Sequence, residues 1–346
     1  MKRSTIITLL LFLFLACQEK NIIKKDNFSY SVTVSAPEEY PVEVHEGWLL
    51  DKDRKMICGI PKAGMAKGGF QFDGAAAAQG GFSIPYHINL TYVAYAEKKF
   101  YSVEADLPAD KIRAAFQKGF LVEKVMSGSE KIDLVHSTYD KFTVALAPGG
   151  VVVVFLGGSS RTEICRLQAK EIFVDRNDFY DNPHERTQQG FFDELFRISV
   201  SDSIKTQIEQ NGIPYGLWDQ YLKKYNYRFT FQPYDDNDVI VTETDHYYNG
   251  EVTTFLQPEE IAKKEYKNLS IPYNIKFYFK KYFTEIEFND TEMFNVFDEL
   301  QSKHPGKPMD ILVVPTFMYN DFKLSVKCED EIVPLTNFKV KGIWGG

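Results

Sequence analysis

The residues of this sequence that could take part in catalysis or metal binding are its histidines, one serine-containing turn and one acidic segment. The six histidines are far apart: His45, His87, His136, His184, His246 and His304. No pair has the His-Glu-x-x-His spacing of a zinc enzyme, and the sequence contains no Gly-x-Ser-x-Gly elbow and no phosphate-binding loop. Gly157-Gly158-Ser159-Ser160 resembles a nucleophile turn only loosely, because no clear helix follows it. We therefore predict no catalytic residues and no cofactor, although tertiary contacts could still bring two histidines together.

The acidic segment Asp235-Asp236-Asn237-Asp238 could supply oxygen ligands for calcium. A solvated turn is the simpler interpretation of the same residues, because a calcium loop needs alternating ligands over a longer stretch. The scattered histidines likewise fit hydrogen-bonded positions in strands better than a shared metal. We predict no metal site.

Cys17 has the sequence setting of a lipid attachment site. Two basic residues precede an apolar run over residues 6–15, which ends in Leu15-Ala16-Cys17. This is the plan of a secretory signal, and the run is short for a membrane span. The motif resembles the bacterial lipobox, with Phe14 where leucine is usual. We predict a signal peptide over residues 1–16 and lipid on Cys17; an ordinary cleaved signal is the alternative.

Residues 17–27 are polar and without periodicity, as expected of a flexible tether. Stable anchoring needs more than one acyl chain, and bacterial lipoproteins carry two or three. Gln18 stands where an aspartate would indicate retention in the inner membrane. The expected location is the cell envelope, anchored by lipid to the outer membrane.

Charge and cysteine content limit the classes of partner and the redox chemistry. The formal net charge is −8, and removal of residues 1–16, which contain two basic residues and no acid, takes it to −10. This charge disfavours nucleic acid as a partner. Cys58, Cys165 and Cys328 allow at most one disulfide, and we predict that all three are small buried residues.

The elements that would position these side chains occur twice. Ser83-Ile84-Pro85-Tyr86-His87-Ile88 returns as Ser270-Ile271-Pro272-Tyr273-Asn274-Ile275, and each hexapeptide opens a strand, a hairpin and a helix. Further matches follow in the same order: Asn27-Phe28 with Asn226-Tyr227, residues 132–135 with 309–312, Tyr139 and Phe142 with Tyr319 and Phe322, and residues 169–173 with 340–344. Several matches in one order predict a duplication.

Strand runs with one inserted helix and short turns predict an α+β fold of two tandem, similar antiparallel-sheet units. Unit one spans residues 28–175, a helical linker spans 176–225 and unit two spans 226–346. A closed barrel or a sandwich is the alternative.

Several local signals mark helices and turns. Ser201 or Asp202 should cap a helix that Gly212 ends, and residues 218–225 should form another. Asn289 or Asp290 should cap the helix of unit two, and residues 191–199 are ambiguous between helix and strand. A short helix is expected within residues 257–266. Asn249-Gly250 is the signature of a type I′ hairpin turn.

A glycine- and alanine-rich stretch over residues 59–81 has no hydrophobic periodicity, and we expect a mobile surface loop there. Aromatic side chains near such a loop could bind a sugar ring or another small ligand. The aromatic binding candidates are Trp48, Tyr86, Tyr92 and Trp218.

Five segments carry a resemblance to a known family. They are Glu97-Lys98-Lys99-Phe100-Tyr101, Asp106-Leu107-Pro108-Ala109, Leu146-Ala147-Pro148-Gly149-Gly150, Arg166-Leu167-Gln168-Ala169 and Gly212-Ile213-Pro214-Tyr215-Gly216-Leu217-Trp218-Asp219. With the lipobox, they resemble an uncharacterised family of bacterial lipoproteins, domain of unknown function 2931. The resemblance covers residues 28–225 well and the rest more faintly, and it implies no catalytic residues. Some relatives are encoded near secreted phospholipase effectors, which implies immunity as one role.

Three functions compete on these observations. The first is a membrane-anchored envelope lipoprotein that binds a protein partner without catalysis, with immunity against a secreted effector as one such role. Acidic surfaces bearing aromatic side chains suit a basic protein partner. The second is a glycan or small-ligand binding lipoprotein, and the third is an enzyme whose site the motifs do not reveal.

Overall fold

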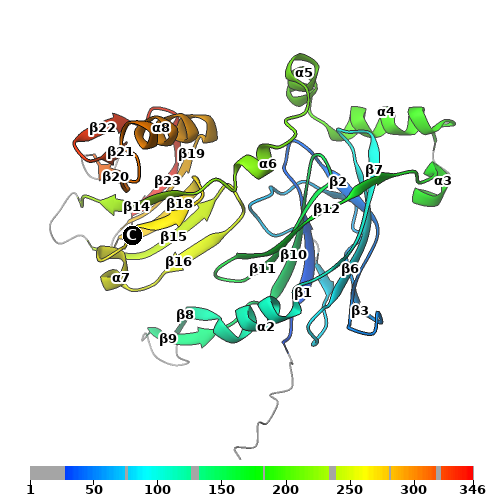
Figure 1. Ribbon diagram of the computed structural model, residues 1–346, viewed down its shortest axis with the longest axis horizontal. Helices are drawn as coiled ribbons and strands as arrows, with labels where there is room; N and C mark the ends of the chain where they lie inside the picture. The colour runs from blue at the N-terminus through cyan, green and yellow to red at the C-terminus, as the bar shows by residue number, and fades with distance from the viewer. Residues whose placement is uncertain are drawn as a thin grey trace, which may run out of the picture.

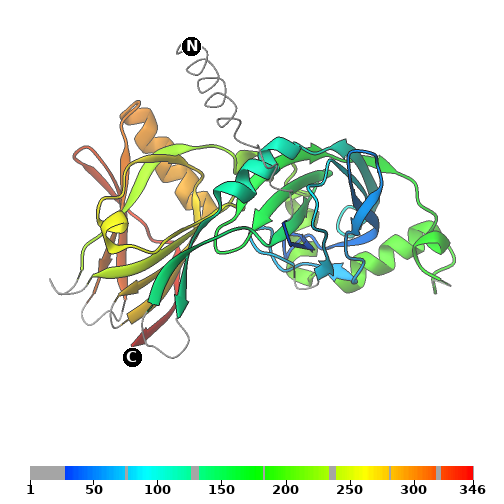
Figure 2. The same cartoon turned by 90° about the horizontal axis from the view of Figure 1, so that it is seen from below.

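The computed structural model describes residues 28–74, 77–125, 132–181, 184–233, 239–279, 282–316 and 321–345. The predicted signal peptide, Cys17 and the tether lie outside these residues, as does the acidic segment 235–238. The described chain is a mixed α+β structure, mostly strands in several sheets, with helices labelled α2 to α8. Its two halves lie side by side along the long axis (Figures 1 and 2).

The first half contains two sheets that face each other. One has the order β12 (Thr162–Gln168), β11 (Val151–Gly157), β10 (Lys141–Ala147), β1 (Ser31–Ser35) and β5 (Ala77–Gln79). The other has the order β13 (Lys170–Ile172), β7 (Lys99–Asp106), β6 (His87–Ala94), β2 (Val42–Leu50) and β3 (Met56–Gly59), and β4 (Met65–Ala66) also pairs with β2. Because strand residues alternate between faces, Val32 and Val144 of the first sheet meet Val44 and Leu90 of the second in one core.

The second half also contains two sheets. One has the order β17 (Lys267–Leu269), β14 (Tyr225–Phe231), β20 (Met309–Pro315), β21 (Phe322–Cys328) and β22 (Glu331–Pro334). The other has the order β16 (Val252–Phe255), β15 (Ile240–Tyr247), β18 (Pro272–Phe279), β19 (Tyr282–Phe288) and β23 (Phe338–Gly345). Phe229 and Ile311 of the first sheet share a core with Ile275 and Phe277 of the second.

One helix follows the equivalent hairpin in each half. Helix α2 (Ala109–Lys118) follows β7 and adds Ile112 and Phe116 to the first core. Helix α8 (Asp290–Lys303) follows β19, and the preceding residue Asn289 caps it, because the Asn289 side chain accepts a hydrogen bond from the Glu292 backbone N–H at 2.9 Å. The predicted start of α8 is therefore confirmed.

The prediction of purely antiparallel sheets is wrong at two pairs of strands. Strand β1 is parallel to β10, and β14 is parallel to β20. In both cases the chain leaves one sheet, forms the hairpin and helix, and re-enters beside its starting strand in the same direction. Each half also has two facing sheets rather than one, so the sandwich that the sequence left open as an alternative is closer to the observed arrangement.

One predicted match and one predicted turn are also wrong. Residues 132–135 belong to β9 (Ile132–Ser137), which pairs with β8 (Phe120–Val125) in a separate two-stranded sheet, whereas 309–312 belong to the central strand β20. At the β15–β16 turn, Gly250 has φ +92° and Asn249 does not have positive φ. Two positive φ values define type I′, so this turn is of another kind, with a glycine in the left-handed region closing it.

Helices α3 (Arg176–Phe179), α4 (Gln188–Ser199), α5 (Asp202–Asn211) and α6 (Leu217–Gln220) connect the halves (Figure 1). The ambiguous residues 191–199 are helical, and α5 has Ser201 and Gly212 as its caps, as predicted. The helix expected over 218–225 has a single turn, because β14 begins at Tyr225. Phe191 of α4 packs on Phe100, so α3 and α4 cover the outer face of β6 and β7.

Most described residues of the glycine-rich stretch are irregular and many are exposed, as expected of a surface loop, but parts of it are built into the sheets. Strands β4 and β5 lie within it, and Phe70 is only 1% exposed. Glycines are needed where it passes β1: a Cβ on Gly80 would lie 1.7 Å from the Tyr30 carbonyl oxygen. Close backbone approach, rather than mobility, therefore accounts for glycine at this position.

The two halves share a hydrophobic core. Every residue of β11 is buried, because one face packs in the first core and the other, including Phe155, joins the core of the second half. Trp218 of α6 lies in this shared core with Phe70 and Tyr40. Arg161 and Val252 also exchange backbone hydrogen bonds of 3.0 and 2.9 Å, which ties the β11–β12 turn to β16.

Candidate functional site

The four aromatic residues predicted to bind a ligand do not form one site. Tyr92 is fully buried in the first core, and Trp218 is 4% exposed in the core between the halves. Trp48 and Tyr86 are half-buried. Trp48 precedes the core residue Leu49 on β2 and so points to the opposite face, whereas Tyr86 packs against the first core. A ligand-binding role remains a prediction for Trp48 and Tyr86 alone.

Each described histidine with a polar contact has a different partner. His87 Nδ1 lies 2.6 Å from Asp106 Oδ1, His136 Nε2 lies 2.8 Å from the Lys118 carbonyl oxygen, and His304 Nε2 lies 3.0 Å from Glu331 Oε2. Within the part of the chain that the structure describes, no three His, Cys, Asp or Glu side chains are grouped as metal ligands would be. Cys58 and Cys328 are buried free thiols, and Cys165 is a half-buried one.

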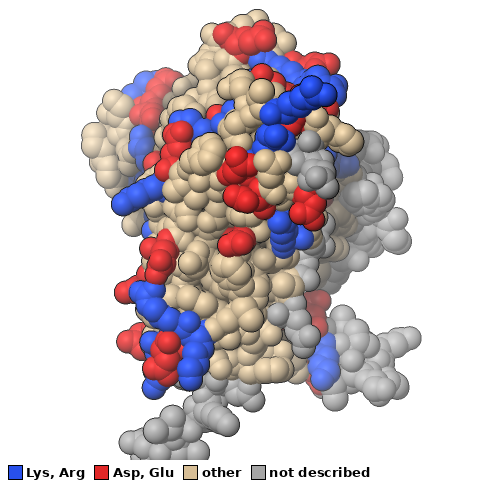
Figure 3. All heavy atoms as spheres, turned by 90° about the vertical axis from the view of Figure 1, so that its right-hand side faces the viewer, with Lys and Arg blue, Asp and Glu red and all other residues tan. Residues whose placement is uncertain are grey.

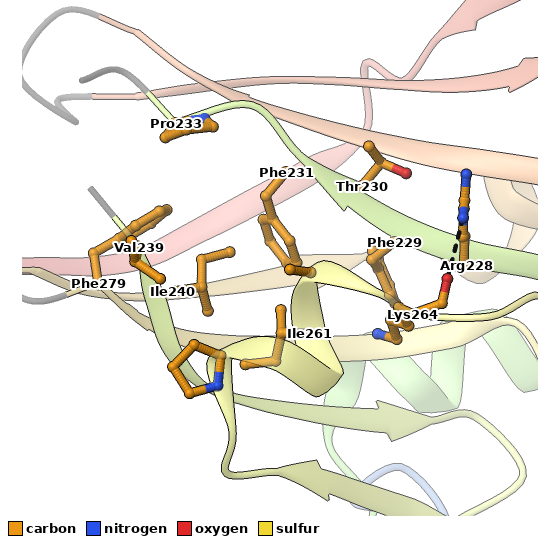
Figure 4. A pocket seen from close by; sticks show the side chains of 12 residues that line it. Arg228, Phe229, Thr230, Phe231, Pro233, Val239, Ile240, Ile261, Lys264 and Phe279 are labelled. Carbon is orange, nitrogen blue, oxygen red and sulfur yellow. Dashed lines mark hydrogen bonds between the residues drawn. The ribbon is translucent and has the colours of Figure 1, made fainter. Parts of the chain in front are cut away.

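A pocket of about 380 Å³ lies in the second half, between β14, β15, the end of β18 and helix α7 (Pro258–Ala262). Helix α7 lies within the segment where a short helix was predicted. Aromatic and aliphatic side chains occupy one end of the pocket, and Lys264 and Arg228 occupy the other (Figure 4). The apolar part of the lining consists of Phe229, Phe231, Val239, Ile240, Ile261, Ala262 and Phe279, with two prolines.

Lys264 closes the polar end of the pocket and is held by two carboxylates. Its Nζ donates hydrogen bonds to Glu243 Oε1 and, at 2.9 Å, to Asp245 Oδ2. The side chains of Glu243 and Asp245 are completely buried, and that of Lys264 is 4% exposed. Glu243 and Asp245 are two residues apart on β15, so their carboxylates point to the same face of the sheet, toward α7.

Aromatic rings and a tyrosine complete the surroundings of the ammonium group. Lys264 Nζ lies 4.9 Å from the Phe229 ring centroid and 4.6 Å from that of Phe255, within the range of cation–π attraction. Tyr247 donates a hydrogen bond of 3.3 Å to Asp245 Oδ2. One oxygen of each carboxyl, Glu243 Oε2 and Asp245 Oδ1, has no hydrogen-bond partner. The group is therefore tightly enclosed but not fully satisfied.

Burial sets the protonation of this cluster. Burial, followed by repulsion from Asp245, raises the pKa of Glu243 well above its usual value. Burial by itself lowers the pKa of Lys264, but the nearby Asp245 and Glu243 carboxylates outweigh it, so the pKa of Lys264 is raised. The raised pKa of Glu243 favours its neutral form and the raised pKa of Lys264 favours its charged form, which reduces uncompensated negative charge in a dry interior.

Arg228, the second cation of the pocket, is also paired. Its Nε donates to Asp310 Oδ1 at 2.7 Å, and its Nη1 donates to the Lys264 carbonyl oxygen at 3.1 Å (Figure 4). The guanidinium carbon lies 4.2 Å from the Tyr266 ring centroid. Both cations at this wall therefore have their charge neutralised by acids of the same half.

This chemistry suits binding better than reaction at the pocket. A lysine acts as a nucleophile when its pKa is lowered, and here the pKa of Lys264 is raised, so the amine stays protonated. The apolar end offers surface that gains free energy when water leaves it, about 25 cal/mol per Å². An occupant with an apolar body fits this lining.

Sequence reasoning missed the Lys264 cluster. Glu243 and Asp245 alternate with Thr242 and Thr244 on β15, and acids are depleted in strands. The sequence signal that could have indicated the cluster was the presence of two acids on one face of a predicted strand. Their lysine partner lies 19 and 21 residues further along the chain, and only the packing of α7 on β15 brings it to them.

Comparison with family models identifies the first part of the chain. The model of the family described as "Protein of unknown function (DUF2931)" matches residues 18–216, more than half of the sequence. The chain belongs to the DUF2931 family. No curated protein and no solved structure matches it significantly.

The DUF2931 segment covers the first half and the helices up to α5. The pocket at Lys264 lies beyond it, in the second half. None of the helices that the structure describes is both long and apolar enough to cross a membrane.

Proposed function

We propose that this DUF2931 protein is a lipid-anchored protein of the cell envelope, held at the outer membrane through Cys17, which binds a protein partner and carries out no catalysis. The pocket beside Lys264 is the observation that carries the binding role. The lipobox-like sequence ending at Cys17 supports the anchor.

The pocket favours an apolar side chain from a protein partner. Val239, at its apolar end, is 41% exposed, whereas Ile261 behind it is 7% exposed. An aliphatic or aromatic side chain entering from the Val239 end would be surrounded by rings and would leave the paired cations undisturbed. Partly exposed apolar pockets of this kind receive the anchor residues of protein interfaces.

The net charge of the chain supports a basic protein as the partner. The chain carries 48 acidic and 40 basic side chains. On the side of the molecule that lies to the right in Figure 1, acidic and basic groups are intermingled rather than gathered by sign (Figure 3). Net charge would steer the encounter with a basic protein, and the pocket would provide the short-range affinity. The resemblance to lipoproteins encoded near secreted effectors makes an effector the first partner to test.

Val239→Arg tests the binding role, because it places a charge at the mouth of the pocket. Ile332→Arg is the matched control, since Ile332 is a 55% exposed apolar residue on β22 that does not line the pocket. Both variants and the wild type, carrying a photo-crosslinker near residue 239, would be tested against each effector encoded beside the gene. We expect Val239→Arg to weaken binding at least tenfold and Ile332→Arg to leave it within about twofold.

Equal binding by the two variants would show that the pocket is not the interface. If cells that lack the protein survived delivery of every effector encoded beside the gene, that result would contradict the immunity role. The test of the pocket with Val239→Arg would still be valid.

Cys17→Ala tests the anchor. The variant should not incorporate labelled fatty acid and should leave the membrane fraction. Retention in the membrane fraction without lipid label would contradict anchoring through Cys17.

We also propose that the two halves are copies of one unit. The strand order β5-β1-β10-β11-β12 corresponds position by position to β17-β14-β20-β21-β22, and β3-β2-β6-β7-β13 to β16-β15-β18-β19-β23. The parallel pair has the same place in both, and a helix follows the same hairpin. An experimental structure whose halves did not superpose strand for strand would refute the duplication.

A further inference from the structure

A second cavity, of about 370 Å³, lies where the two halves meet. The first half contributes residues 71–73 and the Gly157-Gly158-Ser159 turn, and the second half contributes Thr244, His246, Val252 and Thr254. Hydrogen bonds hold its walls together: Arg161 and Val252 pair through their backbones, and Thr254 Oγ1 donates to the Ser159 carbonyl oxygen at 2.7 Å. The serine-containing turn that begins at Gly157 therefore borders a cavity.

Arg161 lines this cavity and is an unusually placed cation. It is 5% exposed, and its guanidinium carbon lies 4.0 Å from the Phe155 ring centroid. Nη1 donates to the Phe70 carbonyl oxygen at 3.1 Å, but neither Nε nor Nη2 has a hydrogen-bond partner. Unmet N–H groups on a buried charged side chain are costly, so they require a partner such as a water, an ion or a bound molecule.

The acid nearest to Arg161 does not satisfy it. Asp73 Oδ1 lies 3.9 Å from Arg161 Nε, too far for a hydrogen bond. Asp73 is instead engaged by Thr143, whose hydroxyl donates at 2.6 Å, and by Lys141, whose Nζ lies 3.2 Å away. One carboxylate thus faces two cations, which leaves the surroundings of the cavity positive.

His246 adds to the polar wall without adding charge. Burial, followed by repulsion from Lys276, lowers its pKa to about 4, so the imidazole is neutral at pH 7. Its Nδ1 is buried and has no hydrogen-bond partner. A neutral imidazole and the hydroxyls of Ser159, Thr244 and Thr254 can each donate to or accept from a bound molecule.

We propose that this cleft between the halves binds a small oxyanion, a phosphate or carboxylate group on a molecule no larger than a monosaccharide, with the free guanidinium N–H groups of Arg161 as its main contact. A guanidinium presents paired donors that match a planar carboxylate or a phosphate edge. The hydroxyls and His246 would contact polar groups on the rest of the ligand. Because both halves line the cleft, an occupant would also fasten them to each other.

Calorimetry on the chain from residue 18 onward tests the proposal, with inorganic phosphate, acetate, glucose 6-phosphate and glucuronate as probes. The two sugar acids distinguish a phosphate from a carboxylate ligand, and the two simple ions show whether the oxyanion alone is sufficient. We expect saturable binding of at least one probe, weakened about tenfold or more in Arg161→Gln. Arg166→Gln, which removes a positive charge from β12, the strand that follows Arg161, without lining the cavity, should bind as the wild type does.

Thr244→Phe keeps the test valid if Arg161→Gln does not fold. It leaves Arg161 in place and fills the cavity from the β15 side, so it too should abolish binding. The proposal is overturned if no probe binds at 10 mM, or if Arg166→Gln loses binding as strongly as Thr244→Phe does.

Discussion

Lys264 shows how a single residue ties the pocket to the stability of the second half. Its ammonium group donates hydrogen bonds to Asp245 and Glu243 and lies against two aromatic rings. A buried ion pair need not stabilise a fold relative to an apolar replacement, but removing one partner leaves a charge without compensation. The cluster is therefore sensitive to single substitutions.

Lys264→Met removes the ammonium group and keeps the length of the side chain. We expect the free energy of unfolding at pH 7 to fall by about 3–5 kcal/mol. This loss of unfolding free energy should become smaller toward pH 5. A buried carboxyl whose pKa is raised, as that of Glu243 is, binds its proton in the folded state, and its contribution to stability is lost as the pH rises. Urea denaturation of this variant and of Lys263→Met, at an exposed neighbour, measures the difference. Equal losses in both variants would contradict the role of the cluster.

Burial of His246 should make the stability of the fold depend on pH in a second way, with the opposite sign. The charges around it are Lys276, Arg161 and Asp245, and burial keeps its folded-state pKa at about 4. The unfolded chain binds a proton near pH 6.5 and the folded one does not, so stability is complete above that pH and falls as the pH drops toward 4. The full effect is on the order of 3 kcal/mol.

In His246→Gln that part of the acid sensitivity should disappear. The measurement is the difference in unfolding free energy between wild type and variant, at pH 7 and at pH 5. A difference that did not change with pH would contradict a buried neutral histidine.

At the scale of elements, local signals and packing agree in some places and compete in others. The caps of α5 and α8 match the sequence because capping involves neighbouring residues alone. Within the stretch over 59–81, Gly74 and Gly80 are required by close approach to Val34 and Tyr30, which are distant in sequence, and not by a local turn. Strand β9 was matched to β20 because similar apolar runs can occupy different sheets.

Asn289→Ala should destabilise the protein by about 1 kcal/mol, because the side chain caps α8 through the Glu292 N–H. Ser201→Ala, at the start of α5, is the control, since Ser201 makes no side-chain cap hydrogen bond. Chemical denaturation midpoints give the comparison. A control loss as large as that of Asn289→Ala would show that the cap bond contributes little.

At the scale of the whole molecule, the shared core couples the two halves. Trp218 from the connecting helices packs near Phe70 and Tyr40 of the first half, in a cluster that also contains Tyr247 of the second. If the two halves moved independently, Arg161 in the cleft between them would not stay buried. We therefore infer that the halves behave as one cooperative body.

Unfolding should follow a single transition, with amide protection in β6 and β21 lost together. Trp218→Ala should lower the unfolding free energy by about 3–5 kcal/mol. Phe173→Ala is the control, because Phe173 is 75% exposed and its loss should change little. Two separate transitions in the wild-type protein would contradict the coupling.

The sequence by itself determined the features that depend on near neighbours: the hairpin and helix after each hexapeptide, the caps of α5 and α8, the lipobox-like motif at Cys17 and the repeated opening hexapeptide. It also contained the continuous apolar run of β11, whose meaning as a strand buried on both faces became clear only with the second half in place. Tertiary structure decided the parallel strand pairs, the burial of Tyr92 and Trp218, and both cavities. Each of these brings together residues far apart in the chain, and no local pattern of residue types records which distant strand will lie alongside.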